Sequence, residues 1–273
     1  MLPPSTLDTI ATEVRAMRDD VRQASPLTSR YPGFDLEDGY AVAARLHRHR
    51  VQDGAVPRGR KIGFTNSRIW PEYNVDQPIW GHVYAHTLHD ATRGPVTLTL
   101  APYAEPKIEP EIAFGLRAAP HPGMRDDALL ACIAWVAPAF EIVQSHFPGW
   151  KFQVADTVAD GGLHGALVLG GKVPVEALGA DPSALLSRLD VTLSRDGAQV
   201  ETGRGANVLG GPVRALSHLV ALLERQGADV ALQPGEIITT GTVTAAYPIA
   251  PGQRWRSEAA GEVLPPLEIA FSA

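Results

Sequence analysis

The sequence predicts an α+β protein in which a helical N-terminal portion precedes a β-rich body. Apolar residues recur at helical spacing near the N-terminus, whereas short β-prone runs between Gly- and Pro-rich turns begin at Lys61. A hydrophobic content of 45% over 273 residues supports a sizeable core. The change in texture near residue 55 gives one candidate boundary. We therefore expect a helical portion over residues 1–55 and a β-rich domain over residues 56–273.

Two helices are expected in the N-terminal portion. The second begins near Leu36, after the turn "YPGFD", and ends near His49. The first is indicated by apolar residues spaced three or four apart, which are Leu7, Ile10, Ala11, Val14, Met17 and Val21. Apolar residues at this spacing form one face of a helix, which must pack against another element.

The body contains seven short β-prone runs, which are "RKIGFT", "PVTLTL", "IEPEIAF", "AFEIVQ", "HGALVLG", "LDVTLSRDG" and "GEIITTG". Two helices are expected to interrupt them. The segment "DDALLACIAWVAP" starts with acidic residues, which favour a helix N-terminus, and ends at Pro138. The segment "PVRALSHLVALLERQG" opens with Pro212 and closes with Gly227, which is the usual asymmetry of helix ends.

Composition excludes several classes of function. The formal net charge is −6 and the 24 basic residues are scattered, so neither nucleic acid nor an anionic membrane surface is an expected partner. The longest apolar run, at 128–140, is shorter than the roughly 20 residues that cross a bilayer. The N-terminus shows no basic segment followed by an apolar one, and Cys132 is the only cysteine. A cytoplasmic location is the resulting expectation.

Three glutamates stand in apolar strand-like runs. Glu109 and Glu111 are two residues apart, so their side chains project from the same face of a strand, and Glu141 lies in the next short apolar run. Unpaired buried carboxylates repel one another, and a bound cation removes that cost. Three carboxylates suit a hard ion such as Mg²⁺ or Mn²⁺. The alternative is that the pair lies on a wet face and that Glu141 pairs with an arginine.

Other motifs are weaker. His82, His86 and His89 lie close in sequence, but β-prone neighbours predict that they diverge, which disfavours a zinc site. The segment "GRGANVLGG" fails as a dinucleotide loop because Val208 takes the place of the third glycine. No G-x-S-x-G nucleophile elbow is present.

Six motifs, in order, resemble the 2-keto-4-pentenoate hydratase and 4-oxalocrotonate decarboxylase family of the fumarylacetoacetate hydrolase superfamily. They are "KIGFTN" at 61–66, "VDQPIWG" at 75–81, "IEPEIAF" at 108–114, "FEIVQS" at 140–145, "WKFQVADTVAD" at 150–160 and "GEIITTGTVTAAYPIAPGQRW" at 235–255. The resemblance spans nearly the whole chain. It implies a mixed β-roll like that of the fumarylacetoacetate hydrolase C-terminal domain, with flanking helices, and makes residues 56–273 the metal-binding catalytic domain.

The resemblance also assigns roles. It implies that Glu109, Glu111 and Glu141 bind the metal and that Lys61 is the cation beside the substrate, where a fixed positive charge stabilises a developing anion. Lys151 is a weaker candidate for the same electrostatic role. Without the family, Lys61 reads as a solvated strand end.

The segment "TTGT" resembles the one that contacts the substrate carboxylate, so Thr240, Gly241 and Thr242 are the expected substrate-binding residues. Glycine permits close approach of the backbone and threonine hydroxyls can donate to an anion, although the segment also reads as a plain strand and turn. His164 stands where relatives carry small polar residues. It could deliver protons or position water, or it could only cap a turn.

The resemblance implies a homo-oligomeric enzyme that hydrates a 2-hydroxy-2,4-dienoate of the 2-keto-4-pentenoate type in aromatic catabolism, through a metal-chelated 2-oxo acid enolate. A 4-oxalocrotonate-type decarboxylase is the runner-up, because "PIWG" with Ile79 resembles decarboxylases whereas "WKFQVADTVAD" resembles hydratases. A C–C bond hydrolase and an inactive partner subunit are further alternatives. Trp70, Trp80 and Trp150 suggest an apolar substrate tail, with "IWPEY" and the N-terminal helices shaping that end of the pocket.

Overall fold

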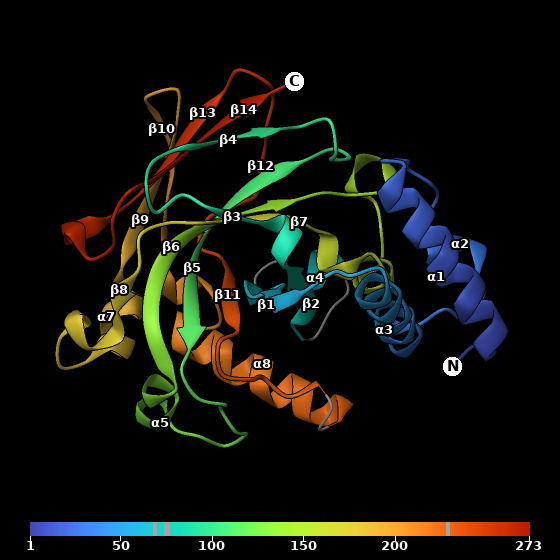
Figure 1. Cartoon of the computed structure of the whole chain (residues 1–273), viewed down its shortest axis with the longest axis horizontal. Coiled ribbons are helices and arrows are strands. Elements are labelled where there is room, and N and C mark those ends of the chain that lie inside the picture. The colour runs from blue at the N-terminus through green and yellow to red at the C-terminus, as the bar shows by residue number, and fades with distance from the viewer. Residues whose placement is uncertain (68–69, 74–76, 228–229) are drawn as a thin grey trace.

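The computed structural model describes residues 1–67, 70–73, 77–227 and 230–273. Three N-terminal helices lie beside two β-sheets (Figure 1). The main sheet is curled, and the long helix α8 packs on its outer face. The α+β class predicted from the sequence is confirmed. Val75 and Asp76 of the motif "VDQPIWG" and Ile69 of "IWPEY" lie outside the described residues.

The N-terminal helices are α1 (Pro4–Asp19), α2 (Leu27–Arg30) and α3 (Leu36–Gln52), close to the predicted spans. The Asp35 side chain caps α3 by accepting a hydrogen bond from the Asp38 backbone N–H, and the Asp38 carboxylate accepts one from the Asp35 backbone N–H. The apolar faces of α1 and α3 share one core with Phe147 and Ala155 from the body. The division near residue 55 stays a prediction.

The main sheet has nine strands in the order β2-β1-β11-β5-β6-β7-β3, with β12 beside β5 and β8 beside β6. They are β1 (Pro57–Gly63), β2 (Ile79–Tyr84), β3 (Leu88–Asp90), β5 (Lys107–Leu116), β6 (Ile133–Val143), β7 (His164–Leu169), β8 (Val173–Pro174), β11 (Ile237–Thr242) and β12 (Tyr247–Pro248). The β1–β11 and β3–β7 pairs are parallel and the other pairs antiparallel.

The main sheet curls into a roll. Val83 of strand β2 packs against Leu167 and Leu169 of β7, although four strands lie between β2 and β7 in the sheet order. The backbones also approach closely there, since a Cβ added at Gly81 would lie 2.4 Å from the carbonyl oxygen of Gly161. The interior of the roll is therefore narrow, and small residues permit its closure.

A second sheet covers part of the outer face of the roll. Its strands, in the order β10-β9-β13-β14-β4, are β4 (Val96–Thr99), β9 (Asp190–Arg195), β10 (Ala198–Arg204), β13 (Arg254–Ala259) and β14 (Leu267–Ser272). Phe140 and Ile142 of the main sheet pack against Trp255 and Phe271 of the second sheet. The residues that alternate with them along β6 consequently face the interior of the roll.

The remaining helices are α4 (Trp70–Tyr73), α5 (Asp126–Ala131), α6 (Val154–Ala159), α7 (Pro182–Arg188) and α8 (Pro212–Gln226), with short 3₁₀ turns at Ala85–Thr87, Pro148–Trp150, Gly161–Leu163, Val175–Leu178, Gly205–Asn207 and Ala260–Glu262. The predicted span of α8 is confirmed. Its Leu216 and Leu219 pack against Ile112 and Phe114 of the sheet.

The helical stretch Gly205–Gln226 is long and apolar enough to cross a membrane by length and composition. However, 56% of its most apolar window is buried inside the protein. Burial of this kind is what the core helix of a globular domain shows, and α8 packs its apolar face on the sheet.

The predicted helix over 126–138 is wrong beyond its first turns. Helix α5 ends at Ala131, strand β6 begins at Ile133, and Pro138 lies within that strand. A strand buried on both faces shows no polar alternation, so its apolar run resembles a buried helix. Pro138 is tolerated because it lies at the gap between β8, which pairs with Val136, and β7, whose pairing with β6 begins at Ala139.

Candidate metal centre

Three carboxylates converge on the inner face of the roll. Glu109 and Glu111 project from β5, and Glu141 on β6 lies directly opposite Glu109 in the strand register. One carboxylate oxygen from each glutamate lies within 4.8 Å of the other two. Residues two apart and their cross-strand partner share one face of a sheet, which explains the convergence. Glu141 is fully buried and Glu111 is 4% exposed, whereas Glu109 is half-buried and lines a cavity.

The three carboxylates have different proton affinities. Burial, and then the charge of Glu141, raises the pKa of Glu109 to about 7. The same causes raise the pKa of Glu111 well above its usual range. Burial also favours the neutral form of Glu141, but the Lys61 ammonium and a hydrogen bond from His164 outweigh it and lower the pKa of Glu141. The cluster therefore resists carrying three negative charges without a cation.

Lys61 is buried beside the carboxylates. Its Nζ lies 3.3 Å from Oε2 of Glu141 and donates a 2.9 Å hydrogen bond to the carbonyl oxygen of Gly162. Burial alone would favour the neutral amine, but the charges of Glu141, Glu109 and Glu111 raise the pKa of Lys61. The ammonium also lines the cavity with Glu109. Lys61 is thus a fixed positive charge at the wall of this cavity.

His164 lies behind Glu141. Its Nδ1 is 2.9 Å from Oε1 of Glu141 and its Nε2 is 2.9 Å from the Thr87 hydroxyl. Burial lowers the pKa of His164 despite the carboxylate, so the neutral ring donates from Nδ1 and accepts at Nε2. The ring is not among the described residues that line the cavity beside Lys61. This geometry favours a role in orienting Glu141 over direct proton transfer to a substrate.

Gly241 is the member of the "TTGT" segment that is most constrained. Its backbone N–H donates a 2.8 Å hydrogen bond to Oε2 of Glu111, and it adopts a φ of +93°. A Cβ added there would lie 1.9 Å from the Thr65 hydroxyl oxygen. Gly241 and Thr242 both line the cavity, whereas Thr240 points to the other face and donates to the carbonyl oxygen of Ile112. The structure therefore does not bring the predicted Thr240 hydroxyl to the site.

The cavity beside the carboxylates has a volume of about 450 Å³. Trp150 and Phe152 form one side of it, and Ile79 and Leu163 also line it. Lys151 is exposed and, among the described residues, does not line this cavity, although its neighbours Trp150 and Phe152 do. Lys151 is therefore not brought to the site.

Only one of the three tryptophans considered for the substrate tail lines this cavity. Trp70 donates from its indole nitrogen to the carbonyl oxygen of Phe64, and Trp80 lines a different cavity. Trp150 remains as an apolar wall, where the Lys107 ammonium lies 3.9 Å from the centre of its ring. The positively charged Lys107 and the negatively charged Glu201 both line the cavity.

The loop at Gly161–Leu163 contributes to the site and was not singled out from the sequence. Asp160 is fully buried and anchors the loop through a 2.8 Å ion pair with Arg18 of helix α1. His146 also contacts Asp160, with Nδ1 2.8 Å from the carboxylate. The carbonyl of Gly162 at the end of this network holds Lys61. The double glycine in "ADGGL" indicates a tight turn. The sequence does not indicate that the Gly162 carbonyl accepts from Lys61, because the two residues are 101 positions apart.

The site fits a hard divalent cation. Oε1 of Glu111 is buried without a hydrogen-bond partner, and Oε2 of Glu141 has only the Lys61 ion pair. Carboxylate oxygens are the ligands that Mg²⁺ and Mn²⁺ prefer. Among the described residues this is the one group of three or more acidic, histidine or cysteine side chains placed to hold a metal. His82, His86 and His89 lie on β2, a 3₁₀ turn and β3 and form no such group.

We expect Mg²⁺ to stabilise the fold more at pH 8 than at pH 5.5. The pKa of Glu109 rises from its ordinary value of 4.5 to about 7 in the folded protein, so its contribution to metal-free stability is lost as the pH rises through 7. A cation binds the ionised form and relieves the repulsion. At saturating Mg²⁺ and pH 8, Tm should rise by about 5 °C or more. Equal shifts at both pH values, measured against K⁺ at matched ionic strength, would contradict this.

Replacing Gly241 by alanine should destabilise the protein by about 2–4 kcal/mol, because a left-handed backbone and a clash with Thr65 add together. Gly252→Ala is the matched control, since Gly252 also has a positive φ, +86°, but has nothing within 4 Å of an added Cβ. Gly252→Ala should lower the free energy of unfolding by about 1 kcal/mol. Urea unfolding measures both, and equal costs would show that the contact with Thr65 is not tight.

Comparisons with known proteins find one family model and relatives named as hydratases and decarboxylases. The family model described as fumarylacetoacetate (FAA) hydrolase C-terminal matches residues 70–268. A 2-hydroxyhexa-2,4-dienoate hydratase of Comamonas testosteroni is 32% identical over 251 residues, which cover 90% of this chain and 92% of that protein. A 4-oxalocrotonate decarboxylase of Pseudomonas sp. strain CF600 is also 32% identical and covers 89% of both chains.

A solved structure is similar along the whole chain. It is a 4-oxalocrotonate decarboxylase from Pseudomonas putida G7 complexed with magnesium and adipate, with a TM-score of 0.91, 27% sequence identity and coverage of 99% of both chains. The mixed β-roll implied by the sequence resemblance is confirmed by this likeness and by the curled sheet.

Proposed function

The chain belongs to the fumarylacetoacetate hydrolase family, and we propose that it is a metal-dependent hydratase that adds water to a 2-hydroxy-2,4-dienoate in the catabolism of aromatic compounds. The observation that carries the proposal is the convergence of three carboxylates beside the Lys61 ammonium, with Glu109 and Lys61 lining one cavity. Relatives named as hydratases of such dienoates support the substrate class.

Glu109, Glu111 and Glu141 would hold one Mg²⁺ or Mn²⁺ ion. When bound, such a cation would supply Lewis-acid chemistry that makes the 2-oxo acid end of the substrate an electron sink. The backbone around Gly241 and the Thr242 side chain lie at the cavity wall, where they would orient the substrate carboxylate. Gly241 also fixes Glu111 through its N–H.

Lys61 would stabilise the charge that develops during hydration. Moving the proton of the 2-hydroxyl group to carbon converts the dienoate into a conjugated 2-oxo acid, and water then adds to the remote end of the remaining double bond. Negative charge collects on the 2-oxygen while the new C–O bond forms, until a proton reaches the neighbouring carbon. A buried ammonium held by Glu141 and Gly162 is preorganised for that charge.

His164 acts in this proposal as a positioning residue. Its contact with Oε1 of Glu141 leaves Oε2 of the same carboxylate, 3.3 Å from Lys61, facing the other acids. The Thr87 hydroxyl fixes the ring from the other side. Orientation of a ligand by a second hydrogen bond is what such outer partners supply in metal sites.

The cavity walls favour a substrate with a short apolar tail. Ile79, Trp150, Phe152 and Leu163 surround the space beyond the carboxylates. A dienoate ending in hydrogen or a methyl group would leave no charge unpaired against these walls. We further expect the enzyme to be cytoplasmic and to form a homo-oligomer. Sedimentation of the purified protein would test the oligomeric state.

A 4-oxalocrotonate-type decarboxylase is the second candidate. Ile79 places an apolar side chain in the cavity, at the position where its motif resembles decarboxylases, and Lys107 could face a second carboxylate. In that reaction the same electron sink would accept the electrons released with CO2.

One assay separates the candidates. Purified protein with Mg²⁺ is given 2-hydroxypenta-2,4-dienoate and, separately, 4-oxalocrotonate, and the products are identified by NMR and by CO2 release. We expect the 4-hydroxy-2-oxo acid from the dienoate and slow or no CO2 release. Release of CO2 without net hydration would favour the decarboxylase. Turnover of neither substrate, together with no binding of Mg²⁺, would favour an inactive partner subunit.

A further inference from the structure

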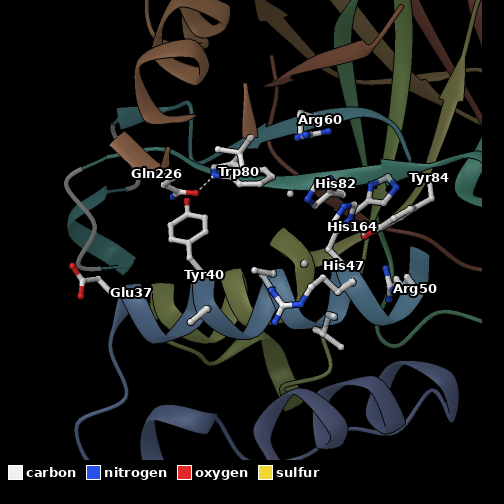
Figure 2. A pocket seen from close by; sticks show the side chains of 18 of the residues that line it. Glu37, Tyr40, His47, Arg50, Arg60, Trp80, His82, Tyr84, His164 and Gln226 are labelled. Atoms are coloured by element: carbon white, nitrogen blue, oxygen red, sulfur yellow. Dashed lines mark hydrogen bonds between the residues drawn. The ribbon is translucent and has the colours of Figure 1, made fainter. Parts of the chain in front are cut away.

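A second cavity lies between helix α3 and strand β2, on the far side of the wall that carries His164. It has a volume of about 550 Å³ and shares no lining residue with the cavity beside Lys61 within the described ranges. Figure 2 shows its labelled side chains, with Tyr40 and His47 rising from α3 toward Trp80 and His82 on β2. The proposed hydration uses none of these four side chains.

A continuous series of rings lines this second cavity. Tyr40 stacks on Trp80 with ring centres 5.9 Å apart, and Trp80 meets His82 edge to face at 5.0 Å. His82 is stacked on His47 at 3.7 Å and 7°, and His47 lies 5.9 Å from Tyr84. These flat surfaces suit a flat ligand, because offset stacking is favourable between planar groups.

Guanidinium groups lie on this ring series. Arg60 sits 5.5 Å from the ring centre of Trp80, and Arg50 sits 5.3 Å from that of Tyr84. No carboxylate of residues 1–67, 70–73, 77–227 or 230–273 is within ion-pair distance of Arg50. Glu37 is the sole acidic side chain among the described lining residues. The cavity therefore has an excess of positive charge.

Several buried nitrogens of this cavity lack hydrogen-bond partners. They are Nε of Arg18, Nε of Arg60 and Nδ1 of His82, and both arginine side chains are more than nine-tenths buried. Unpartnered buried donors are rare in folded proteins because each costs free energy. Both arginines have one acidic partner, Asp160 at 2.8 Å and Glu236 at 3.3 Å, which occupies other nitrogens.

The two stacked imidazoles are neutral. Burial, and then the charge of Arg60, lowers the pKa of His82 to about 2, and burial lowers the pKa of His47. The positive charge of the cavity therefore belongs to the guanidinium groups. Those of Arg18 and Arg60 each have an Nε–H without a hydrogen-bond acceptor. Gln226, the one side-chain amide among the described residues that line the cavity, already accepts from the indole nitrogen of Trp80 at 2.9 Å.

We propose that this second cavity binds a small organic carboxylate with a flat, unsaturated body. The carboxylate would meet the guanidinium of Arg50, the free Nε–H of Arg60 and Nδ1 of His82, in the ring tautomer that carries its proton on this nitrogen, and its body would lie against the rings of Trp80 and Tyr84. Arginine forks match carboxylate geometry, and aromatic walls select a planar ligand. This is an anion site separate from the carboxylate cluster, which would bind a cation.

Benzoate is the probe, because it is flat and carries one carboxylate but has no 2-oxo group for chelation. Calorimetric titration of the full chain, with and without Mg²⁺, should give one benzoate per chain and the same affinity in both conditions. Arg50→Gln should weaken binding by about tenfold or more. Arg58→Gln is the matched control, since Arg58 lies two residues before Arg60 on β1, is exposed and does not line the cavity. It should change affinity by less than about twofold.

A second measurement does not depend on a variant that folds. Ring nitrogen signals of ¹⁵N-labelled histidine in the unmodified protein should shift for His82 and His47 on addition of benzoate, while His121 and His218, which lie outside this cavity, should not move. His82→Phe keeps the stacked ring, removes the nitrogen and should also weaken binding. No saturable binding, binding only with Mg²⁺, unchanged affinity in Arg50→Gln, or inorganic phosphate binding as tightly as benzoate would each overturn the proposal.

Discussion

Glu111→Gln should stabilise the metal-free protein and abolish its response to Mg²⁺. The carboxylate of Glu111 is buried with one oxygen unpartnered, and burial and the charges of Glu141 and Glu109 hold its pKa far above the usual range. A neutral amide of the same shape removes that repulsion and can still accept from the Gly241 N–H. It also removes one cation ligand. Activity should fall by about 10³-fold or more, since several kcal/mol of charge stabilisation are lost.

Thermal unfolding with and without Mg²⁺ measures both effects in one experiment. Wild type should be less stable than Glu111→Gln without the metal and more stable than it with the metal. Glu258→Gln is the control, because Glu258 also lies on a strand but is exposed, at 61%. The unfolding temperature of Glu258→Gln should equal that of wild type both without and with Mg²⁺. A Glu111→Gln protein that is less stable than wild type without Mg²⁺ would mean that the carboxylate has no repulsive neighbours.

Lys61→Met should have the opposite effect on the metal-free protein. Removing the buried ammonium leaves Glu141 without its cation, so the metal-free fold loses stability. The more negative cluster should then gain more from Mg²⁺ than wild type does. Turnover should nevertheless fall by about 10²–10³-fold, because a fixed positive charge at the developing oxyanion is lost. The comparison separates metal binding from catalysis.

Lys151→Met is the matched control for Lys61→Met. Lys151 was a candidate for the same electrostatic role, but its side chain is exposed and does not line the cavity beside Lys61. Its replacement should alter turnover by less than about twofold. Steady-state rates and Mg²⁺ titrations of both variants decide the matter. If Lys151→Met lost as much activity as Lys61→Met, the cavity beside Lys61 would not be the substrate site.

Strand periodicity was sufficient to place Glu109 and Glu111 on one face. It could not place Glu141 opposite Glu109, because the β5–β6 register depends on a connection that contains a helix and a turn. The family resemblance supplied that grouping. The error at 126–138 has a related cause, since a strand covered on both sides carries no polar alternation to distinguish it from a helix.

The directions of side chains within a motif could not be predicted from the sequence either. The segment "TTGT" indicated a binding loop, but only the fold shows that Thr240 donates to Ile112 while Gly241 holds Glu111. His164 presented the same difficulty, because its ring reaches Glu141 from behind, where a different cavity begins. The contact between Lys61 and Gly162 joins distant segments, which no local pattern encodes.

The cavity between α3 and β2 shows the same limit on a larger scale. His47 and His82 belong to separate helical and strand segments, and their stacking appears only when the N-terminal helices pack on the roll. In the sequence His82 was considered only with His86 and His89, as a possible zinc cluster. Its actual neighbours are rings and guanidiniums.

A crystal structure of the protein grown with Mn²⁺ and oxalate would show whether the three glutamates hold one metal ion, because manganese is located by its anomalous scattering. We expect one manganese peak per chain, bonded to one oxygen from each of Glu109, Glu111 and Glu141, with oxalate on the open side of the metal next to Lys61 and Gly241. A map with no manganese among these three carboxylates, or with the metal bound elsewhere in the chain, would contradict this expectation.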